Sequence, residues 1–295
     1  MVKDRPGALP YALAVATVVV WSSTFIATKV LLSAFTPMEV LFYRFFLAWV
    51  FMFALYPRVH RPESAKSELL IALAGVAGGS LYFIAENVAL SLSLASNVSL
   101  LVSTAPILTA VLAARFVPGE RLERRFALGA LVAFAGAILV ILNGKFVLRL
   151  NPAGDILALS SSLSWAVYCV IIRRLKTSQN EFYVTRKIFF YTLVTALPAL
   201  ALSPLRMDFS PLRDPTMVIC LAFLTLFASC AAYLSWNRVI RAFGPTKANA
   251  FIYFIPLLTL IESAIFIGEP LTPFALAGGL LIFAGVWVGS RAKKQ

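Results

Sequence analysis

Four ionisable side chains stand inside long apolar stretches of the sequence: Lys29, Arg44, Glu86 and Glu262. Such groups are costly at the depth of a lipid bilayer, and by default they indicate a functional site. Glu86 follows Tyr82 by four residues, so on a helix the two side chains share a face. A carboxyl group there is suited to binding a substrate amine or to exchanging a proton. The alternative is an ion pair with Lys29 or Arg44 that only fixes helix positions, and for Arg44 this structural role is favoured.

Aromatic and polar side chains form a second set of candidates. Trp and Tyr offer flat apolar surfaces with a polar tip, which suits the wall of a cavity for an apolar or zwitterionic solute. The alternative for such residues is an aromatic belt at the membrane interface, or ordinary helix packing. The predicted cavity residues are Trp21, Tyr82, Glu86, Asn87, Ser99, Ser103, Trp165, Tyr168, Trp236, Asn237, Asn249 and Tyr253, with Lys29 and Arg44 as charge partners.

Two prolines, Pro106 and Pro256, lie in the middle of apolar stretches. Each removes one backbone hydrogen bond and tends to bend its helix. A polar side chain precedes each proline by three residues, Ser103 in the first case and Tyr253 in the second. Paired helix breaks at corresponding positions favour a transport site or a gate. A packing kink without gating is the alternative.

Composition places these residues in a membrane. The chain has 295 residues, of which 60% are hydrophobic and 13% charged, and its mean hydropathy is +0.87. This apolar excess is too large for the interior of a soluble fold of that length. A membrane-spanning helix needs about 20 apolar residues, and a barrel strand would alternate apolar and polar residues instead. The ten predicted spans run roughly over 10–32, 37–56, 68–90, 95–116, 125–142, 152–174, 184–203, 216–240, 246–267 and 273–290.

The sequence also repeats itself at an offset of about 150 residues. Asn87 precedes Pro106 by nineteen residues, and a second Asn and Pro with the same separation follow about 150 residues later. Each half holds five predicted spans, and because five is odd the second half enters the membrane from the opposite side. Inverted repeats of this kind are typical of alternating-access transporters. We therefore predict an all-α integral membrane protein with ten transmembrane helices as two inverted five-helix repeats, residues 1–145 and 146–295.

Basic residues are distributed unevenly between the predicted loops. Twenty Lys and Arg residues fall on one side, whereas the other side has only Lys145, Arg149, Arg206 and Arg213. This is the positive-inside pattern, which predicts that both termini are cytoplasmic. The net charge of +13 then reflects topology and not a nucleic-acid partner. The predicted location is the inner membrane of a bacterial cell.

Several short motifs in order along the chain resemble the EamA family of the drug/metabolite transporter superfamily. They are Trp21-Ser-Ser-Thr-Phe25, Arg44-Phe-Phe, Pro106 followed by Gly119-Glu120, Asn151-Pro-Ala-Gly-Asp155, Trp165 with Tyr168, and Pro256 followed by Gly268-Glu269. The resemblance implies ten helices with both ends inside and the export of amino acids or related metabolites. Within that family the chain resembles the aromatic amino-acid exporters of the YddG type.

Enzymatic motifs are missing from the sequence. It has no His-Glu-x-x-His, Gly-x-Ser-x-Gly or phosphate-binding Gly-rich motif. Its three cysteines lack paired spacing, and its single histidine, His60, lies in a loop. We therefore predict that the protein is not an enzyme and that it needs no metal and no cofactor.

The leading functional hypothesis is a secondary transporter that exports small metabolites, above all amino acids with aromatic or other apolar side chains. It would work by alternating access, as a facilitator or as a proton-coupled antiporter. The alternatives are an exchanger of phosphorylated sugars or nucleotide conjugates, which would need several deep Lys or Arg residues, and a receptor or assembly factor without transport. The expected partners are a small-molecule substrate and the lipid bilayer, and a weak homodimer is left open.

Overall fold

The computed structural model describes residues 7–93, 95–142, 151–203, 205–206, 208–266 and 272–290. All regular structure within these ranges is helical. Among the described residues, eight helical stretches are long and apolar enough to cross a membrane: α1 (Ala8–Leu31), α2 (Pro37–Leu55), Ala65–Leu92, Val98–Phe116, α7 (Arg124–Leu142), α8 (Pro152–Arg174), α9 (Glu181–Leu202) and Pro215–Phe243. They coincide with the first eight predicted spans.

The last two predicted spans are also helical where they are described. The ninth consists of α12 (Pro245–Ala250), the 3₁₀ turn η4 (Phe251–Phe254) and α13 (Ile255–Phe266), and the tenth is α14 (Pro273–Ser290). Neither contains an unbroken apolar helix as long as the other eight. The count of ten spans and the inversion of the halves therefore stay predictions.

Parts of the predicted pattern lie outside the described residues. They are the boundary between the halves at residues 145–146, the basic residues Lys145 and Arg149, and the Gly268-Glu269 motif.

Helix starts follow local capping rules. The Thr36 hydroxyl accepts a hydrogen bond from the Glu39 amide, and the Glu39 carboxylate accepts one from the Thr36 amide, so the two form a capping box at the start of α2. Asn151 caps α8 by accepting a hydrogen bond from the amide of Gly154. A proline occupies the first position of each helix, where its missing N–H has no intrahelical partner to lose.

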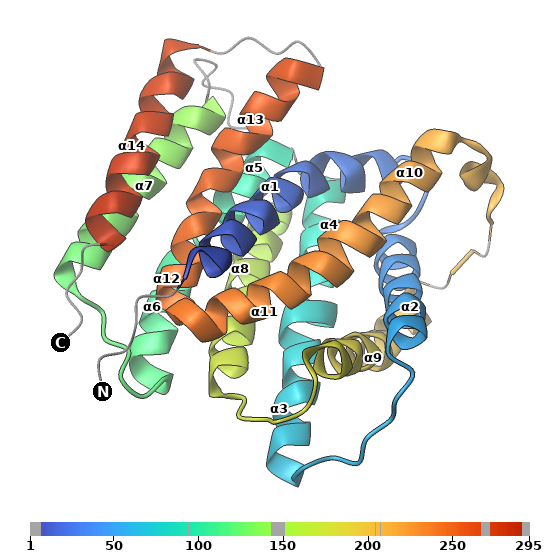
Figure 1. Cartoon of the computed structure of the whole chain (residues 1–295). Helices are drawn as coiled ribbons and strands as arrows, with labels where there is room; N and C mark the ends of the chain where they lie inside the picture. Colours follow the sequence, from blue (N-terminus) through green and yellow to red (C-terminus); the bar gives the residue numbers. More distant parts are fainter. Residues whose placement is uncertain are drawn as a thin grey trace.

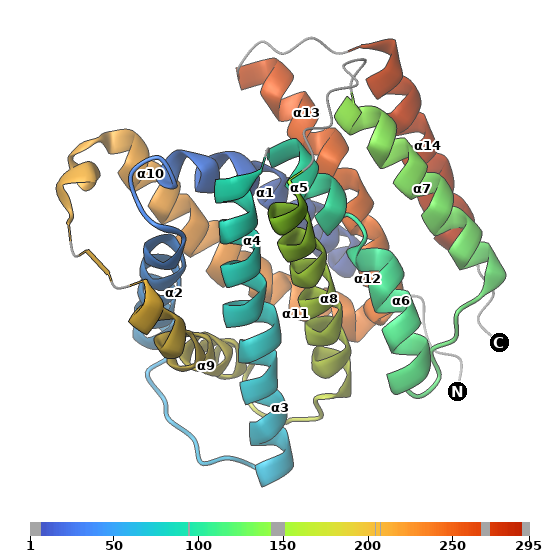
Figure 2. The same cartoon turned by 180° about the vertical axis from the view of Figure 1, so that it is seen from behind.

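The helices form a bundle with a distinct edge. α7 and α14 lie side by side at one edge, while α2 and α9 lie at the opposite side (Figures 1 and 2). The largest buried apolar cluster draws on the helices between and around them, including α1, α2, α8, α9 and the stretch that ends at Phe243. The core therefore sits away from the α7–α14 pair.

Glycines bring α7 and α14 into backbone contact. A Cβ atom added at Gly129 would lie 2.4 Å from the carbonyl oxygen of Gly285, and one at Gly136 would lie 2.5 Å from that of Gly278. No real Cβ approaches another atom so closely, so larger residues would force the pair apart. Such small-residue contacts replace the hydrophobic drive that is absent between helices in lipid.

Two of the long stretches contain a π-helical turn at corresponding places. The turn η1 (Val76–Leu81) separates α3 (Ala65–Gly75) from α4 (Tyr82–Leu92), and η3 (Leu224–Ala231) separates α10 (Pro215–Phe223) from α11 (Ala232–Phe243). The start of α4 and the start of α11 lie 150 residues apart. π turns are rare and frequently occur at functional sites.

The fourth and ninth predicted spans both break just before their prolines. α5 (Ala95–Val102) ends three residues before α6 (Ala105–Phe116), whose second residue is Pro106. Pro256 is likewise the second residue of α13, after the 3₁₀ turn η4. The missing proline N–H cannot bond to the carbonyl four residues earlier, so each helix ends and restarts at this point.

Candidate functional site

A cavity opens where elements of both halves meet, with an empty volume of about 500 Å³. Its lining residues are Trp21, Thr24, Phe25, Arg44, Tyr82, Phe83, Glu86, Val102, Ala105, Trp165, Tyr233, Ile252 and Ile255. They come from α1, α2, α4, α8, α11 and the two broken helices. Most of the wall is therefore aromatic or aliphatic, with two charged side chains.

Two tryptophans form the centre of the wall. The ring of Trp21 on α1 meets that of Trp165 on α8 edge-on at 5.2 Å between centroids. The Trp165 indole N–H donates a hydrogen bond to the Asn249 side-chain oxygen at 3.2 Å. The Trp21 indole N–H donates to the carbonyl of Ala228, also at 3.2 Å. Both rings are thus held by their polar tips, and both line the cavity while Tyr168 packs against Trp165 and Trp236 against Trp21.

Glu86 and Tyr82 lie together on α4, as their spacing predicts. The Tyr82 hydroxyl donates to Glu86 Oε1 at 2.7 Å, and the Tyr82 ring lies 5.4 Å from that of Trp165. Only 8% of the Glu86 surface is exposed. The carboxyl group is therefore anchored at one oxygen and faces the cavity with the rest of its surface.

Arg44 lies in the same wall but forms no ion pair with Glu86. Its Nε donates to the Ser229 hydroxyl at 2.6 Å, and its guanidinium carbon sits 4.4 Å from the centre of the Phe83 ring. Within the described ranges no carboxylate oxygen lies within 4.0 Å of its nitrogens. The ion pair with Glu86 that the sequence leaves open as an alternative is therefore not formed in the described structure, although each charge acts on the other.

Lys29, unlike Arg44, does not line the cavity. Its ammonium donates to the carbonyl of Leu90 at 2.6 Å, near the carboxyl end of α4. Arg173, at the end of α8, makes the same kind of contact with the carbonyl of Arg241 at 2.6 Å. A positive charge at a helix carboxyl end satisfies free carbonyls and the negative end of the dipole. Lys29 thus has a capping role and is not the predicted charge partner of Glu86.

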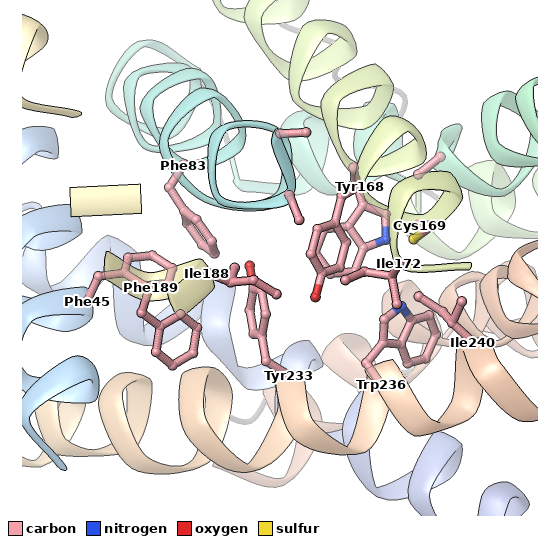
Figure 3. Close-up of a cluster of buried hydrophobic side chains, with 14 of the residues drawn as sticks. Phe45, Phe83, Tyr168, Cys169, Ile172, Ile188, Phe189, Tyr233, Trp236 and Ile240 are labelled. Carbon is pink, nitrogen blue, oxygen red and sulfur yellow. The ribbon is translucent and has the colours of Figure 1, made fainter. Parts of the chain in front are cut away.

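Four predicted cavity residues form a layer behind the wall. The Tyr168 hydroxyl donates to the Asn237 side-chain oxygen at 2.6 Å, and Asn249, whose amide donates to Pro245, receives the Trp165 indole N–H. Trp236 is fully buried with its centroid 4.9 Å from that of Trp21. Figure 3 shows Tyr168, Tyr233 and Trp236 facing one another between α8 and α11. These side chains orient the lining residues and do not line the cavity themselves.

The other predicted residues also lie outside the lining. The Asn87 amide donates to the Pro37 carbonyl at 3.1 Å, which ties α4 to the start of α2. The Ser103 hydroxyl donates to the Ser99 carbonyl at 2.8 Å inside the broken fourth span, and Tyr253 is buried. Pro106 and Pro256 do not line the cavity, but the residue before each of them, Ala105 and Ile255, does.

The lining residues that sequence reasoning missed are mostly apolar, and the repeat could have found them. Three pairs of lining residues are separated by the repeat offset of 150: Phe83 with Tyr233, Val102 with Ile252, and Ala105 with Ile255. Thr24 and Phe25 follow Trp21 by one helical turn. Apolar residues carry no chemical signal of their own, so only their matched positions in the repeat would have drawn attention to them.

Carbonyl groups of the π turns are bound by side chains from the opposite half. The Tyr233 hydroxyl donates to the carbonyl of Gly78 at 2.5 Å, and Trp21 donates to that of Ala228, 150 residues further along. Ser164 also donates to the carbonyl of Ala77 at 2.7 Å. Two cavity-lining aromatic residues, Trp21 and Tyr233, thus each join one half of the chain to the π turn of the other.

Glu262 on α13 binds α1 and lies outside the cavity. Its two carboxylate oxygens accept hydrogen bonds from the hydroxyls of Ser22 at 2.5 Å and Ser23 at 3.0 Å. The Thr259 hydroxyl adds a bond to the Ser22 carbonyl at 3.0 Å. The first span of one half is thereby fastened to the ninth span of the other.

No cluster of three or more His, Cys, Asp or Glu side chains suited to a metal ion occurs in the part of the chain that the structure describes. The cysteines Cys169, Cys220 and Cys230 are free thiols.

A sequence model of the EamA-like transporter family matches the chain twice, over residues 8–142 and 152–291. Among similar proteins is a probable terminal-alkyne amino-acid exporter of Streptantibioticus cattleyicolor, 28% identical over 278 residues, or 94% of this chain and 92% of that protein. A probable amino-acid metabolite efflux pump of Salmonella typhimurium is 26% identical over 285 residues, with 94% and 93% of the two chains covered.

One crystal structure aligns with 96% of this chain and 99% of its own at a TM-score of 0.76 and 20% sequence identity. At that identity the likeness concerns the fold alone. The arrangement of helices described above is thus one that another protein adopts over its whole length.

Proposed function

Because the chain belongs to the EamA-like transporter family, we propose that it is a secondary transporter that exports amino acids with aromatic or other apolar side chains. Membership of this family confirms the resemblance seen in the motifs. Together with the many apolar helices it makes the chain a multi-pass membrane protein related to metabolite exporters. The relatives are named as exporters or pumps, which is consistent with a protein that moves solutes and does not transform them.

The observation that carries this proposal is the composition of the cavity wall. It combines the aromatic faces of Trp21 and Trp165 with one carboxyl group, Glu86, and one guanidinium group, Arg44. Small-molecule sites are mostly apolar with a few placed polar groups, and the lining of this cavity has that composition. An apolar amino acid has the matching pattern of two opposite charges and one apolar side chain.

The proposed mechanism is alternating access between two inverted five-helix halves, residues 1–145 and 146–295. Lining residues at matched positions of the repeat support a site at the interface of the halves, where such transporters bind substrate. The broken spans beside the cavity, ahead of Pro106 and Pro256, are where we place the gating movement. Both termini would be cytoplasmic in the inner membrane, and the solute or a proton gradient would supply the energy.

The phosphorylated-sugar exchanger is supported less well. A phosphate or diphosphate group needs several convergent Lys or Arg side chains. Arg44 is the one cation that lines the cavity in the described structure, and Lys29 is engaged at the end of α4. A receptor or assembly factor without transport would have no need of a cavity with both charges, and a transport assay separates it from an exporter.

Counterflow into liposomes tests the proposed function. Vesicles that contain the purified protein and are loaded with unlabelled L-phenylalanine should accumulate the labelled amino acid from outside. Trp165→Ala should slow this uptake strongly. Trp287→Ala is the matched control, because Trp287 is 56% exposed on α14 and lies outside the cavity. Absence of counterflow for every apolar amino acid with a correctly folded protein, or counterflow of a sugar phosphate instead, would contradict the proposal.

A further inference from the structure

Arg44 is a buried cation in the middle of an apolar helix. Only 3% of its surface is exposed, yet it lines the cavity. A charge removed from water is stable only when opposite charge or hydrogen-bond acceptors surround it. The partners of the guanidinium group therefore indicate what the site is built to hold.

Those partners do not accept hydrogen bonds from the two terminal nitrogens of the side chain. Nε donates to Ser229, and the ring of Phe83 packs against the guanidinium plane. The two terminal Nη groups have no hydrogen-bond acceptor among the residues that the structure describes. Glu86 acts on Arg44 through its charge but stands too far away for an ion pair.

Arg186 on α9 shows how this protein satisfies a buried arginine that has only a structural role. It is similarly buried, at 4% exposure. Its Nη1 donates to the carbonyl of Tyr56 and its Nη2 to that of Arg58 at 2.8 Å, so both terminal groups are used at the end of α2. Arg44 lacks such acceptors and faces a cavity instead.

We propose that the Nη groups of Arg44 bind the carboxylate of the transported solute, with Glu86 receiving the amine of the same molecule. This inference rests on the proposed function and specifies the substrate class as solutes with a free carboxylate. A guanidinium group presents parallel N–H donors that match the two oxygens of a carboxylate. The ammonium and carboxylate groups of an α-amino acid are attached to the same carbon atom, so the residues that bind them must lie close together without forming an ion pair with each other. Arg44 and Glu86 meet both conditions.

The arrangement also assigns the orientation of the solute. With its head group between α2 and α4, the apolar side chain would lie against Trp21 and Trp165. A simple amine would lose the contact with Arg44 and leave that charge buried and unpaired. A neutral ester would do the same, so the cavity should discriminate strongly in favour of the carboxylate.

A double-mutant cycle on binding tests the assignment. The affinities of the full-length protein in detergent for L-phenylalanine and for its methyl ester, which keeps the amine and loses the negative charge, are measured by tryptophan fluorescence. We expect the wild type to bind the amino acid about tenfold more tightly or better, as for a hydrogen bond between charged groups. Arg44→Gln should remove this preference, and Arg44→Lys should retain part of it.

Arg115→Gln is the matched control, since Arg115 lies at the end of α6 outside the cavity and should keep the full preference. If Arg44→Gln does not fold, the comparison of the two ligands on the wild type still decides. A wild-type protein that binds L-phenylalanine no better than the ester, or that binds neither, would overturn the proposal, as would a preference that survives in Arg44→Gln.

Counterflow separates this inference from the function on which it rests. Preferential binding that depends on Arg44, without any counterflow of L-phenylalanine, would remove the transport function and keep the carboxylate site. Counterflow of the amino acid and of its methyl ester at the same rate would keep the transport function and overturn the role of Arg44.

Discussion

At the scale of single residues, the cavity combines charge with aromatic surface. Tyr82 holds one oxygen of Glu86, and Trp165 packs against Tyr82, so the carboxyl group has a fixed position before any solute arrives. Groups that are positioned in advance lose less freedom on binding, which raises affinity. The precision of the site therefore depends on residues of α4 and α8 together.

The charge of Glu86 gives the first prediction. Glu86→Gln keeps an oxygen that can accept the hydrogen bond from Tyr82 but loses the negative charge. We expect the affinity for L-phenylalanine to fall about tenfold or more, because hydrogen bonds to charged groups contribute about 1.5–3 kcal/mol. Binding of 3-phenylpropionate, which has no amine, should change little.

Tyr82→Phe serves as the control for this experiment, since it frees the carboxyl group without removing its charge and should have the smaller effect. A folded Glu86→Gln protein that binds both ligands as the wild type does would leave the aromatic walls as the recognition element.

Sequence reasoning identified several residues that line the cavity, but it did not separate them from residues buried behind the lining. Trp21, Tyr82, Glu86 and Trp165 were predicted from residue type and spacing, and the structure places all four at the cavity. Tyr168 follows Trp165 by three residues, yet its hydroxyl turns to Asn237 and the ring is buried. Helical spacing gives the direction of a side chain, whereas the neighbouring helix that packs over it decides whether it reaches the cavity.

At the scale of elements, the departures from a regular α-helix lie beside the site. Both π turns and both proline breaks occur in spans that contribute lining residues. The breaks could be predicted because proline lacks an N–H donor. The π turns could not, since no residue type specifies them: η1 contains two glycines, whereas η3 contains none.

The proline breaks give the second prediction. Pro106→Ala supplies an N–H that can bond to the carbonyl of Val102 and join α5 to α6. We expect slower counterflow of L-phenylalanine at near-normal expression, because the joined helix resists the gating movement. Pro198→Ala is the matched control, since Pro198 lies within α9 away from the cavity lining and should leave the rate unchanged. If Pro106→Ala also transports at the wild-type rate, the break before Pro106 has no role in gating.

The loop between α2 and α3 gives a prediction on pH. Glu63 accepts hydrogen bonds from the hydroxyl of Ser178 at 2.5 Å and from its amide at 2.9 Å, and these bonds hold the pKa of the Glu63 carboxyl below its ordinary value. A carboxyl group with a lowered pKa in the folded state stabilises that state at neutral pH. The stabilisation is lost as the pH falls through the folded-state pKa.

We therefore expect Glu63→Gln to lower the Tm at neutral pH, and the difference from the wild type to vanish in strong acid. Thermal unfolding at the two pH values measures this. The effect should be small because Glu63 is exposed. The control variant Glu123→Gln should behave as the wild type does, whereas a difference for Glu63→Gln that does not depend on pH would contradict the assignment.

At the scale of the whole molecule, hydropathy predicted where the first eight spans begin and end to within a few residues. It could not predict that α7 and α14 lie at the edge of the bundle. A helix that faces lipid and a helix that faces the core are both apolar, so composition does not separate them. The glycines Gly129, Gly136, Gly278 and Gly285 mark the pair, but only the structure shows that they meet one another.

The uneven distribution of basic residues gives a prediction on topology. A cysteine placed at Asp208 should react with an impermeant thiol reagent from outside the cell, whereas one at Ser64 should react only after lysis. Cys220 is partly buried, so the background is best made Cys220→Ser. The opposite labelling pattern would overturn the assignment of cytoplasmic termini.

The hydrogen bonds from Tyr233 to Gly78 and from Trp21 to Ala228 have a consequence for biogenesis. Lipid offers no water to replace a missing donor, so a backbone carbonyl at that depth needs a partner within the protein. In each half a π-turn carbonyl receives a side-chain donor from the other half. The amino-terminal half, synthesised first, therefore lacks the donor from Tyr233 until the rest of the chain has been inserted. We expect each half expressed alone to be degraded in the cell, and the two halves expressed together as separate chains to rescue each other.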